Sequence, residues 1–282
     1  MKSIWKALCA AALVGLSMMP AQAQEKTIKL GTMAWEDMIP IAQIAKKVLE
    51  NKGYTVNVTT FSEWGIAYAA LTKGDIQVIA SHVDYVAQDY WNRNKARLEK
   101  ISVVSHGLYQ AFGVPNYVTI DSTEELNANA DKFGNKIIGI EPGSGLMREA
   151  TDAVSAYALK PKLVEGSTAG MTAALKSAVD RNEWIVVTIW DPTWMFDKYR
   201  MKFLKDPKGI FAPPQSLNLI AQKGFSEKYP EARELLAGIF VSRDDIAGIS
   251  SAVKDGKTTD EAVKDWINAH AELIKRWENV KR

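Results

Sequence analysis

Apolar positions along the chain alternate between the spacing of strands and the spacing of helices. Three short runs predict strands: "TIKLGTMAW" (27–35), "YTVNVTTF" (54–61) and "DIQVIAS" (75–81). Between them, "MIPIAQIAKKVLENKG" (38–53) and "GIAYAALTKG" (65–74) have apolar residues at helical spacing, and each ends at a glycine, as helices often do. This strand–helix–strand–helix–strand order predicts a mostly parallel sheet flanked by helices.

The same alternation starts again further along the chain. A strand is predicted at 135–140, followed by the glycine turn "EPGSG" (141–145), helices at 146–159 and 171–183, and a strand in "WIVVTIW" (184–190). The chain leaves the first unit near "FGVPNYV" and returns near "APPQSLNLIA", where two prolines mark a boundary. We therefore expect lobe I to comprise residues 24–113 and 213–282, and lobe II residues 114–212. Two crossings between two lobes predict a hinged clamp.

The N-terminus predicts a signal peptide over residues 1–23. Lys2 and Lys6 precede an apolar stretch from Ala7 to Met19, and a small-x-small site ends at Ala23. The apolar stretch is too short to span a bilayer, and Cys9 lies too early in it for a lipid anchor. We expect cleavage after about Ala23 and a periplasmic mature protein.

Composition narrows the classes of function. Without Lys2 and Lys6, the 35 basic residues become 33, against 33 acidic ones. A net charge near zero argues against nucleic acid or an anionic membrane as the main partner. The single cysteine lies in the signal peptide, which excludes disulfides and thiol chemistry from the mature chain. No metal or organic cofactor is expected.

Tryptophans gather where predicted strands end. Trp35 ends the first strand, Trp64 follows the second, and "VVTIWDPTW" places Trp190 at a strand end with Trp194 four residues later. Any single one of them is more often a cap on the core. Ligands of open α/β sheets, however, bind outside the carboxyl ends of the strands, and several aromatic faces there suit a quaternary ammonium. Trp194 is expected to pack beneath Trp190 as core support.

The turn "EPGSG" is the candidate for the other end of such a ligand. Gly143 and Gly145 allow a close backbone approach, and the helix that follows directs free N–H groups from around Ser144 toward a carboxylate. An ordinary strand-to-helix turn is the alternative. The stretch lacks the third glycine of a dinucleotide fingerprint and the glycine spacing of a nucleophile elbow.

Few residues are available for catalysis. "SHVD" places His82 and Asp84 at the end of the third strand, half of a catalytic or metal site, so a periplasmic hydrolase or lyase stays as the alternative class of function. A ligand-contacting or core histidine is the simpler interpretation. Asp37 is either a hydrogen-bond acceptor for a ligand hydroxyl or, more simply, the solvated N-cap of the 38–53 helix.

The order of segments resembles the glycine betaine/choline substrate-binding proteins of ABC transporters, the OpuAC-like family of type II periplasmic binding proteins. The resemblance covers essentially the whole mature chain. Its most specific stretches are "GYTVNVTTF", "YAALTKGDIQV", "IGIEPGSG", "TIWDPTWMFDKYRMKFLKDPKG" and "WINAHAEL".

The resemblance implies a Venus-flytrap clamp of two α/β lobes that passes a small zwitterion to an inner-membrane permease. It implies a cage role for Trp190 and Trp35, and a cleft-lining role for the turn at Gly143–Gly145. Two positions depart from the family pattern: His82 stands where relatives often have tryptophan, and Thr193 where many have histidine. Trp64, Trp91 or Tyr109 is left to supply the missing wall.

We therefore expect a monomeric receptor, not an enzyme, for a solute of the glycine betaine type. Choline, carnitine, proline betaine and histidine stay open as ligands. The expected contacts are Trp35, Trp64, Trp190 and Tyr109 around the cation, with Gly143, Ser144, Gly145 and His82 at the carboxylate.

Overall fold

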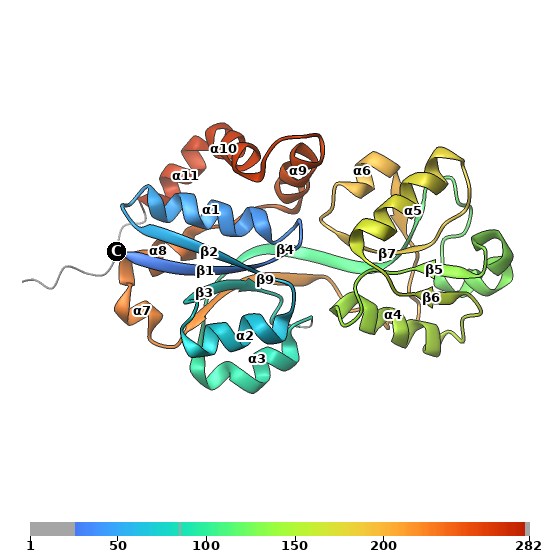
Figure 1. The fold of residues 1–282 in the computed structure, drawn as a ribbon, viewed down its shortest axis with the longest axis horizontal. Coiled ribbons are helices and arrows are strands. Elements are labelled where there is room, and N and C mark those ends of the chain that lie inside the picture. Colours follow the sequence, from blue (N-terminus) through green and yellow to red (C-terminus); the bar gives the residue numbers. More distant parts are fainter. Residues whose placement is uncertain (1–25, 85, 280–282) are drawn as a thin grey trace, which may run out of the picture.

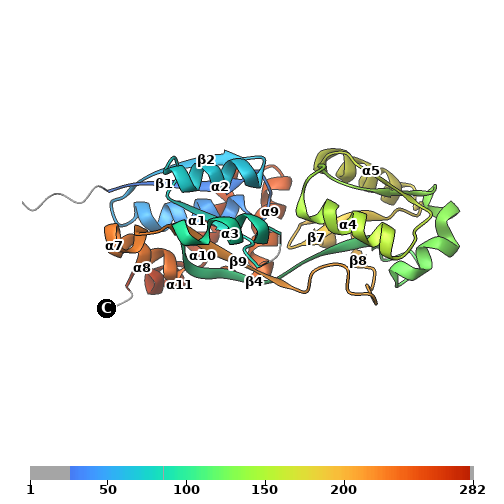
Figure 2. The same ribbon diagram turned by 90° about the horizontal axis from the view of Figure 1, so that it is seen from below.

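The structure, a computed structural model, describes residues 26–84 and 86–279; the predicted signal peptide lies outside this range. The described residues form two hydrophobic cores. One core takes side chains from Ile28 to Leu108 and from Leu217 to Trp277, and the other lies between Ala111 and Phe211. Figures 1 and 2 show the corresponding two lobes side by side along the long axis of the molecule.

The first lobe is a sheet with helices on both faces. Its strands are β1 (Thr27–Met33), β2 (Thr55–Phe61), β3 (Val78–Ser81), β9 (Gln215–Gln222) and the first part of β4 (Leu98–Pro115). They lie in the order β2-β1-β3-β9-β4. β1 is parallel to β2 and β3, whereas β9 is antiparallel to both of its neighbours, so four of the five strands run the same way.

Helices cover both faces of this sheet. In Figure 1, α1 and the C-terminal helices lie on one face, and α2 and α3 lie on the other. The helices of this lobe are α1 (Ile39–Glu50), α2 (Trp64–Lys73), α3 (Gln88–Asn94), α7 (Phe225–Lys228), α8 (Pro230–Gly238), α9 (Arg243–Lys254), α10 (Thr259–Ala269) and α11 (Ala271–Glu278), with a 3-10 turn at Lys95–Arg97.

The second lobe repeats the design on a smaller scale. Its elements are β5 (Lys136–Ile138), α4 (Gly145–Ala156), β6 (Lys162–Val164), α5 (Thr168–Asp180), β7 (Val187–Asp191), α6 (Met195–Tyr199) and β8 (Met201–Phe203), preceded by a 3-10 segment at Thr123–Phe133. β5 is parallel to β6 and β7, and β4 is antiparallel to β7 and β8. Helices α4 and α5 lie on opposite sides of this sheet (Figure 1).

Two neighbouring strands join the lobes. The 18 residues of β4 pair with β9 in the first lobe and with β7 and β8 in the second. Register shifts interrupt the β4–β9 ladder between Lys100 and Leu108, and such bulges increase twist and bend a strand. β4 is therefore a strand of the sheet in both lobes. The residues of β4 that directly follow its pairing with β9 lie between the two lobes.

The predicted α/β class with two lobes of mostly parallel sheet is confirmed. The predicted 38–53 helix ends three residues before Gly53, which has φ +82°. The first predicted strand ends at Met33, so Trp35 lies in the loop beyond it. The full length of β4 was not predicted.

Candidate functional site

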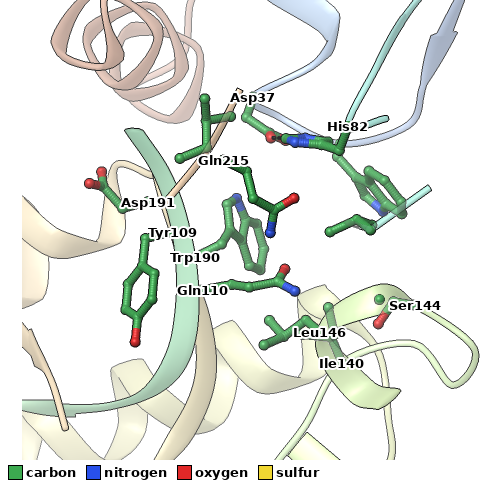
Figure 3. A pocket seen from close by; sticks show the side chains of 14 residues that line it. Asp37, His82, Tyr109, Gln110, Ile140, Ser144, Leu146, Trp190, Asp191 and Gln215 are labelled. Carbon is green, nitrogen blue, oxygen red and sulfur yellow. Dashed lines mark ion pairs between the residues drawn. The ribbon is translucent and has the colours of Figure 1, made fainter. Parts of the chain in front are cut away.

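A cavity lined by residues of both lobes lies between them (Figure 3). Its wall is formed by Trp35, Asp37, His82, Val86, Leu108, Tyr109, Gln110, Ile140, Ser144, Gly145, Leu146, Trp190, Asp191 and Gln215. Its volume is about 60 Å³, several times the roughly 10–15 Å³ that one water molecule needs. The cavity therefore has room for the head group of a small molecule.

Trp35 of the first lobe and Trp190 of the second each place an indole in the wall of this cavity. Trp35 packs against the core of the first lobe and Trp190 against the core of the second. Trp190 is in β7, directly opposite Gln110 of β4, and strand residues paired in this way share one face of the sheet. Both indoles are partly buried, so each keeps a surface for a ligand.

Three other aromatics differ from one another in position. Trp64 is almost completely buried and is absent from the wall; its ring meets that of Trp35 edge-on, with centroids 5.6 Å apart. Trp91 packs on the first core, also outside the cavity. Tyr109 borders the cavity, but Figure 3 shows its ring on the other side of β4 from Trp190, where it packs against Phe203 with centroids 4.9 Å apart.

The glycine turn reaches the cavity at the start of α4. Ser144 is the N-cap, and its hydroxyl accepts from the Met147 N–H at 3.3 Å. Ser144, Gly145 and Leu146 line the wall, whereas Gly143, with φ +82°, does not. The first N–H groups of a helix have no acceptor within that helix, so this end of α4 presents donors and the positive end of the helix dipole to the cavity.

Gly145 also allows the two lobes to approach each other. A Cβ built on it would lie 2.6 Å from Val86 Cγ1, which is too close for any other residue without a shift. The neighbouring Arg148 donates from Nη2 to the Val86 carbonyl at 3.1 Å. The start of α4 therefore lies directly against the first lobe.

Asp37 is not the solvated N-cap that the sequence favoured. The N-cap of α1 is Met38, without a side-chain cap bond, and Asp37 is buried in the cavity wall. Burial raises the pKa of its carboxyl to about 7, with the charge of Glu36 adding to the rise. The expectation failed because an acid just before a helix is usually exposed, whereas here the opposite lobe helps to enclose the site.

His82 is also buried in the wall, and burial lowers the pKa of its imidazole to about 4. Its Nε2 lies 3.9 Å from Asp37 Oδ2, beyond hydrogen-bond distance. Because the imidazole is neutral at neutral pH, His82 and Asp37 do not form an ion pair there.

Asp84, the alternative catalytic partner of His82, is near enough for its charge to oppose the effect of burial on the pKa of the imidazole, but it does not share the cavity with His82. Asp84 is half-exposed, and its carboxylate lies 3.4 Å from Lys100 Nζ. Asp84 is also absent from the cavity wall.

Sequence reasoning missed three polar residues of the wall. Gln110 of β4 and Gln215 of β9 are 9% and 6% exposed, and both face the cavity in Figure 3. Asp191 pairs with the Arg243 guanidinium; burial raises the pKa of its carboxyl, and the charge of Arg243 opposes that rise. The only signal in the sequence was adjacency: Gln110 follows the predicted Tyr109, Asp191 follows the predicted Trp190, and Gln215 follows the second proline of the predicted boundary.

Glu36 connects the lobes beside the cavity. Its carboxylate accepts a hydrogen bond from Trp194 Nε1 at 2.7 Å and another from the Thr193 hydroxyl, while its carbonyl accepts from Ser250 Oγ at 2.7 Å. The Lys254 ammonium lies 4.8 Å from the centroid of the Trp194 ring. Trp194 does pack in the second core, as expected, and it also contacts the first lobe.

Two further properties follow from the described residues. Within residues 26–84 and 86–279, no three His, Cys, Asp or Glu side chains are grouped as metal ligands. In the same part of the chain, every helix is too short or too polar to cross a bilayer.

Comparison with known proteins places the chain among solute receptors. It is 35% identical to the glycine betaine/carnitine transport binding protein of Listeria monocytogenes over 150 residues, 52% of this chain, and spans about half the length of that relative (50%). It is 21% identical to the glycine betaine-binding periplasmic protein of Dickeya dadantii over 282 residues, covering 85% of each. The crystal structure of lactococcal OpuAC, closed and complexed with glycine betaine, matches with a TM-score of 0.81 at 28% identity, covering 90% of this chain and 100% of that chain.

The family model for the substrate-binding domain of ABC-type glycine betaine transport systems matches residues 26–269. This match confirms the resemblance predicted from the sequence, and the two lobes agree with those of the solved relative. The chain therefore belongs to the OpuAC family of substrate-binding domains.

Proposed function

We propose that this protein is the extracytoplasmic receptor of an ABC importer and binds a small quaternary ammonium solute, of the glycine betaine and choline class, between its lobes. The observation that carries the proposal is the meeting of Trp35 and Trp190, one from each lobe, at a single cavity. The faces of indole rings attract cations that cannot donate hydrogen bonds, by about 0.5–2 kcal/mol each.

The electrostatics of the wall support a cationic group. The wall contains the carboxyls of Asp37 and Asp191 and no lysine or arginine. Because Arg243 pairs with Asp191, Asp37 is the carboxyl left to face a ligand cation. A trimethylammonium group between Trp35 and Trp190 would also be close to this carboxyl.

The start of α4 suits the other end of the ligand. The N–H groups around Ser144 and Gly145 are donors for a carboxylate, as in glycine betaine, carnitine or proline betaine. His82 lies in the same wall and adds a neutral polar group. Choline and histidine stay as alternative ligands, because Asp37 would accept from a hydroxyl or an ammonium.

Transport follows from closure of the clamp. We propose that lobe I (24–113 and 213–282) and lobe II (114–212) separate by bending at β4 and β9, and that a ligand favours the closed form because only that form contacts it from both sides. Export by the signal peptide would place the mature monomer in the periplasm, where an inner-membrane permease accepts the solute.

Calorimetric titration with glycine betaine, choline, carnitine, proline betaine and histidine tests the proposal. We expect at least one quaternary ammonium to bind and to be recovered unchanged, whereas an enzyme would return product. Trp190→Ala should abolish binding. Trp184→Ala is the matched control, because Trp184 belongs to the same lobe but packs on Phe133 outside the cavity. Affinity that survives Trp190→Ala for every ligand would disprove the aromatic site.

A further inference from the structure

Two carboxamides extend into the cavity from the strands that join the lobes. Gln110 is in β4 and Gln215 is at the start of β9. Gln215 pairs with Leu108, and Gln110 pairs with Trp190, so backbone ladders fix where both side chains begin. Figure 3 shows the two amide groups close to each other and beside the Trp190 indole.

These side chains bring unpaired polar atoms to the cavity. Among the described residues, Gln215 Oε1, Trp190 Nε1 and His82 Nδ1 are buried without a hydrogen-bond partner, and so is Gln110 Nε2. These four residues line the same cavity. Glu149, outside the wall, is the protein group nearest to sharing the Gln110 amide: burial raises the pKa of its carboxyl to about 7, and the amide opposes that rise. Buried polar groups are normally paired, and those left unpaired cost free energy. A ligand in the cavity is the natural partner for atoms that face it together.

The unpaired atoms include both hydrogen-bonding roles. Trp190 Nε1 and Gln110 Nε2 donate, whereas Gln215 Oε1 accepts. In the amide orientations of the structure, the unpaired position of Gln215 is therefore the acceptor of the wall, and those of Gln110 and Trp190 are its donors. A ligand that satisfies this wall therefore needs an acceptor and also an O–H or N–H donor.

We propose that Gln110 and Gln215 determine specificity by requiring a hydrogen-bond donor and an acceptor on the same ligand. The preferred solute is then an ammonium compound that carries a hydroxyl group, not a fully methylated betaine, which has acceptors only. This inference rests on the proposed function, because the indoles hold the ammonium while the amides distinguish its substituents. The carboxyl of Asp37, in the same wall, adds a second acceptor for the donor.

The test compares choline with its O-methyl ether, in which a methyl group replaces the hydroxyl hydrogen, so that the donor is lost; the leucine variants below distinguish this loss from the added size. Calorimetry on the full mature chain should show choline binding at least about 10-fold more tightly, the effect of about one lost hydrogen bond. Gln215→Leu and Gln110→Leu should each reduce this ratio while both ligands still bind. Gln222→Leu is the matched control, because Gln222 ends the same strand outside the cavity, and it should leave the ratio unchanged.

The outcomes separate this inference from the proposed function. If neither compound nor any betaine binds to the wild type, the proposed function fails and the inference fails with it. If the ammonium compounds bind but choline has no advantage, or if both leucine variants keep the wild-type ratio, only the role of the glutamines is wrong. Thermal unfolding of each ligand-free variant, compared with Gln222→Leu, shows that a changed ratio does not come from a misfolded chain.

Discussion

Trp194→Phe should weaken ligand binding although Trp194 does not line the cavity. The variant keeps an aromatic ring in the second core, but it removes the pyrrole part of the indole, including the N–H that donates to Glu36 Oε2 at 2.7 Å. That bond joins residues of different lobes, so it forms only when the lobes are together. Glu36 is largely enclosed in this arrangement. Burial raises the pKa of its carboxyl, and the hydrogen bonds from Thr193 and Trp194 oppose that rise.

The size of the effect follows from the type of bond. A hydrogen bond to a charged group contributes about 1.5–3 kcal/mol. If the ligand-free protein is mostly open, the whole loss falls on closure, and affinity decreases by about 10-fold to about 150-fold. If the wild type is instead already closed without ligand, the substitution would shift the ligand-free protein toward the open form, and the loss of affinity would be smaller.

Calorimetry gives the affinity, and small-angle scattering with and without ligand gives the closed fraction. The matched control is Asp255→Asn, which removes an ion pair with Lys198 of the other lobe at 3.4 Å. Both of those side chains are about half-exposed, and such pairs contribute roughly 0–1 kcal/mol, so its affinity should change less than that of Trp194→Phe. Affinity and scattering of Trp194→Phe equal to those of the wild type would refute the reasoning.

Three other substitutions and one pH profile test the wall and the core behind it. Because burial raises the pKa of Asp37 to about 7, folding favours its protonated form, and its contribution to stability falls as the pH rises from about 4 to about 7; Asp37→Asn should therefore raise the melting temperature more at pH 8 than at pH 4. In the wild type, calorimetry should show affinity for choline increasing up to about pH 7, where the carboxylate ionises. Gly145→Ala should weaken binding, because its Cβ would meet Val86, and equal affinity would show that the lobes tolerate the shift. Trp64→Ala should lower the free energy of unfolding by about 3–5 kcal/mol, measured in urea, because Trp64 is buried against Trp35.

The sequence predicted the fold well because its strands and helices differ in apolar spacing. The run "YTVNVTTF" is an example: predicted as a strand over 54–61, it forms β2 (Thr55–Phe61). The β4 strand was missed because its bulges interrupt the alternation on which strand prediction rests. Its register shifts are visible only when β9 lies beside it.

The cavity was predicted only in part, for a different reason. Trp35 follows β1 and Trp190 is one of the last two residues of β7, and the carboxyl ends of strands mark ligand sites in open α/β sheets. Trp64 follows a strand as well, but it begins α2 and turns inward, a difference of orientation that spacing does not reveal. Gln110 and Gln215 become site residues only because two strands distant in sequence cross between the lobes, and glutamine in a strand carries no motif of its own.

The arrangement of neighbours explains why binding and closure are coupled. On the first lobe, Trp35 and Asp37 line the cavity while Glu36 between them bonds to the other lobe. On the second lobe, Trp190 lines the cavity, and Trp194, four residues later, donates to Glu36. A ligand that draws Trp35 and Trp190 together therefore brings Glu36 and Trp194 into hydrogen-bond distance by the same movement. The two tryptophans of "VVTIWDPTW" thus have different contacts, one with the cavity and one with the opposite lobe.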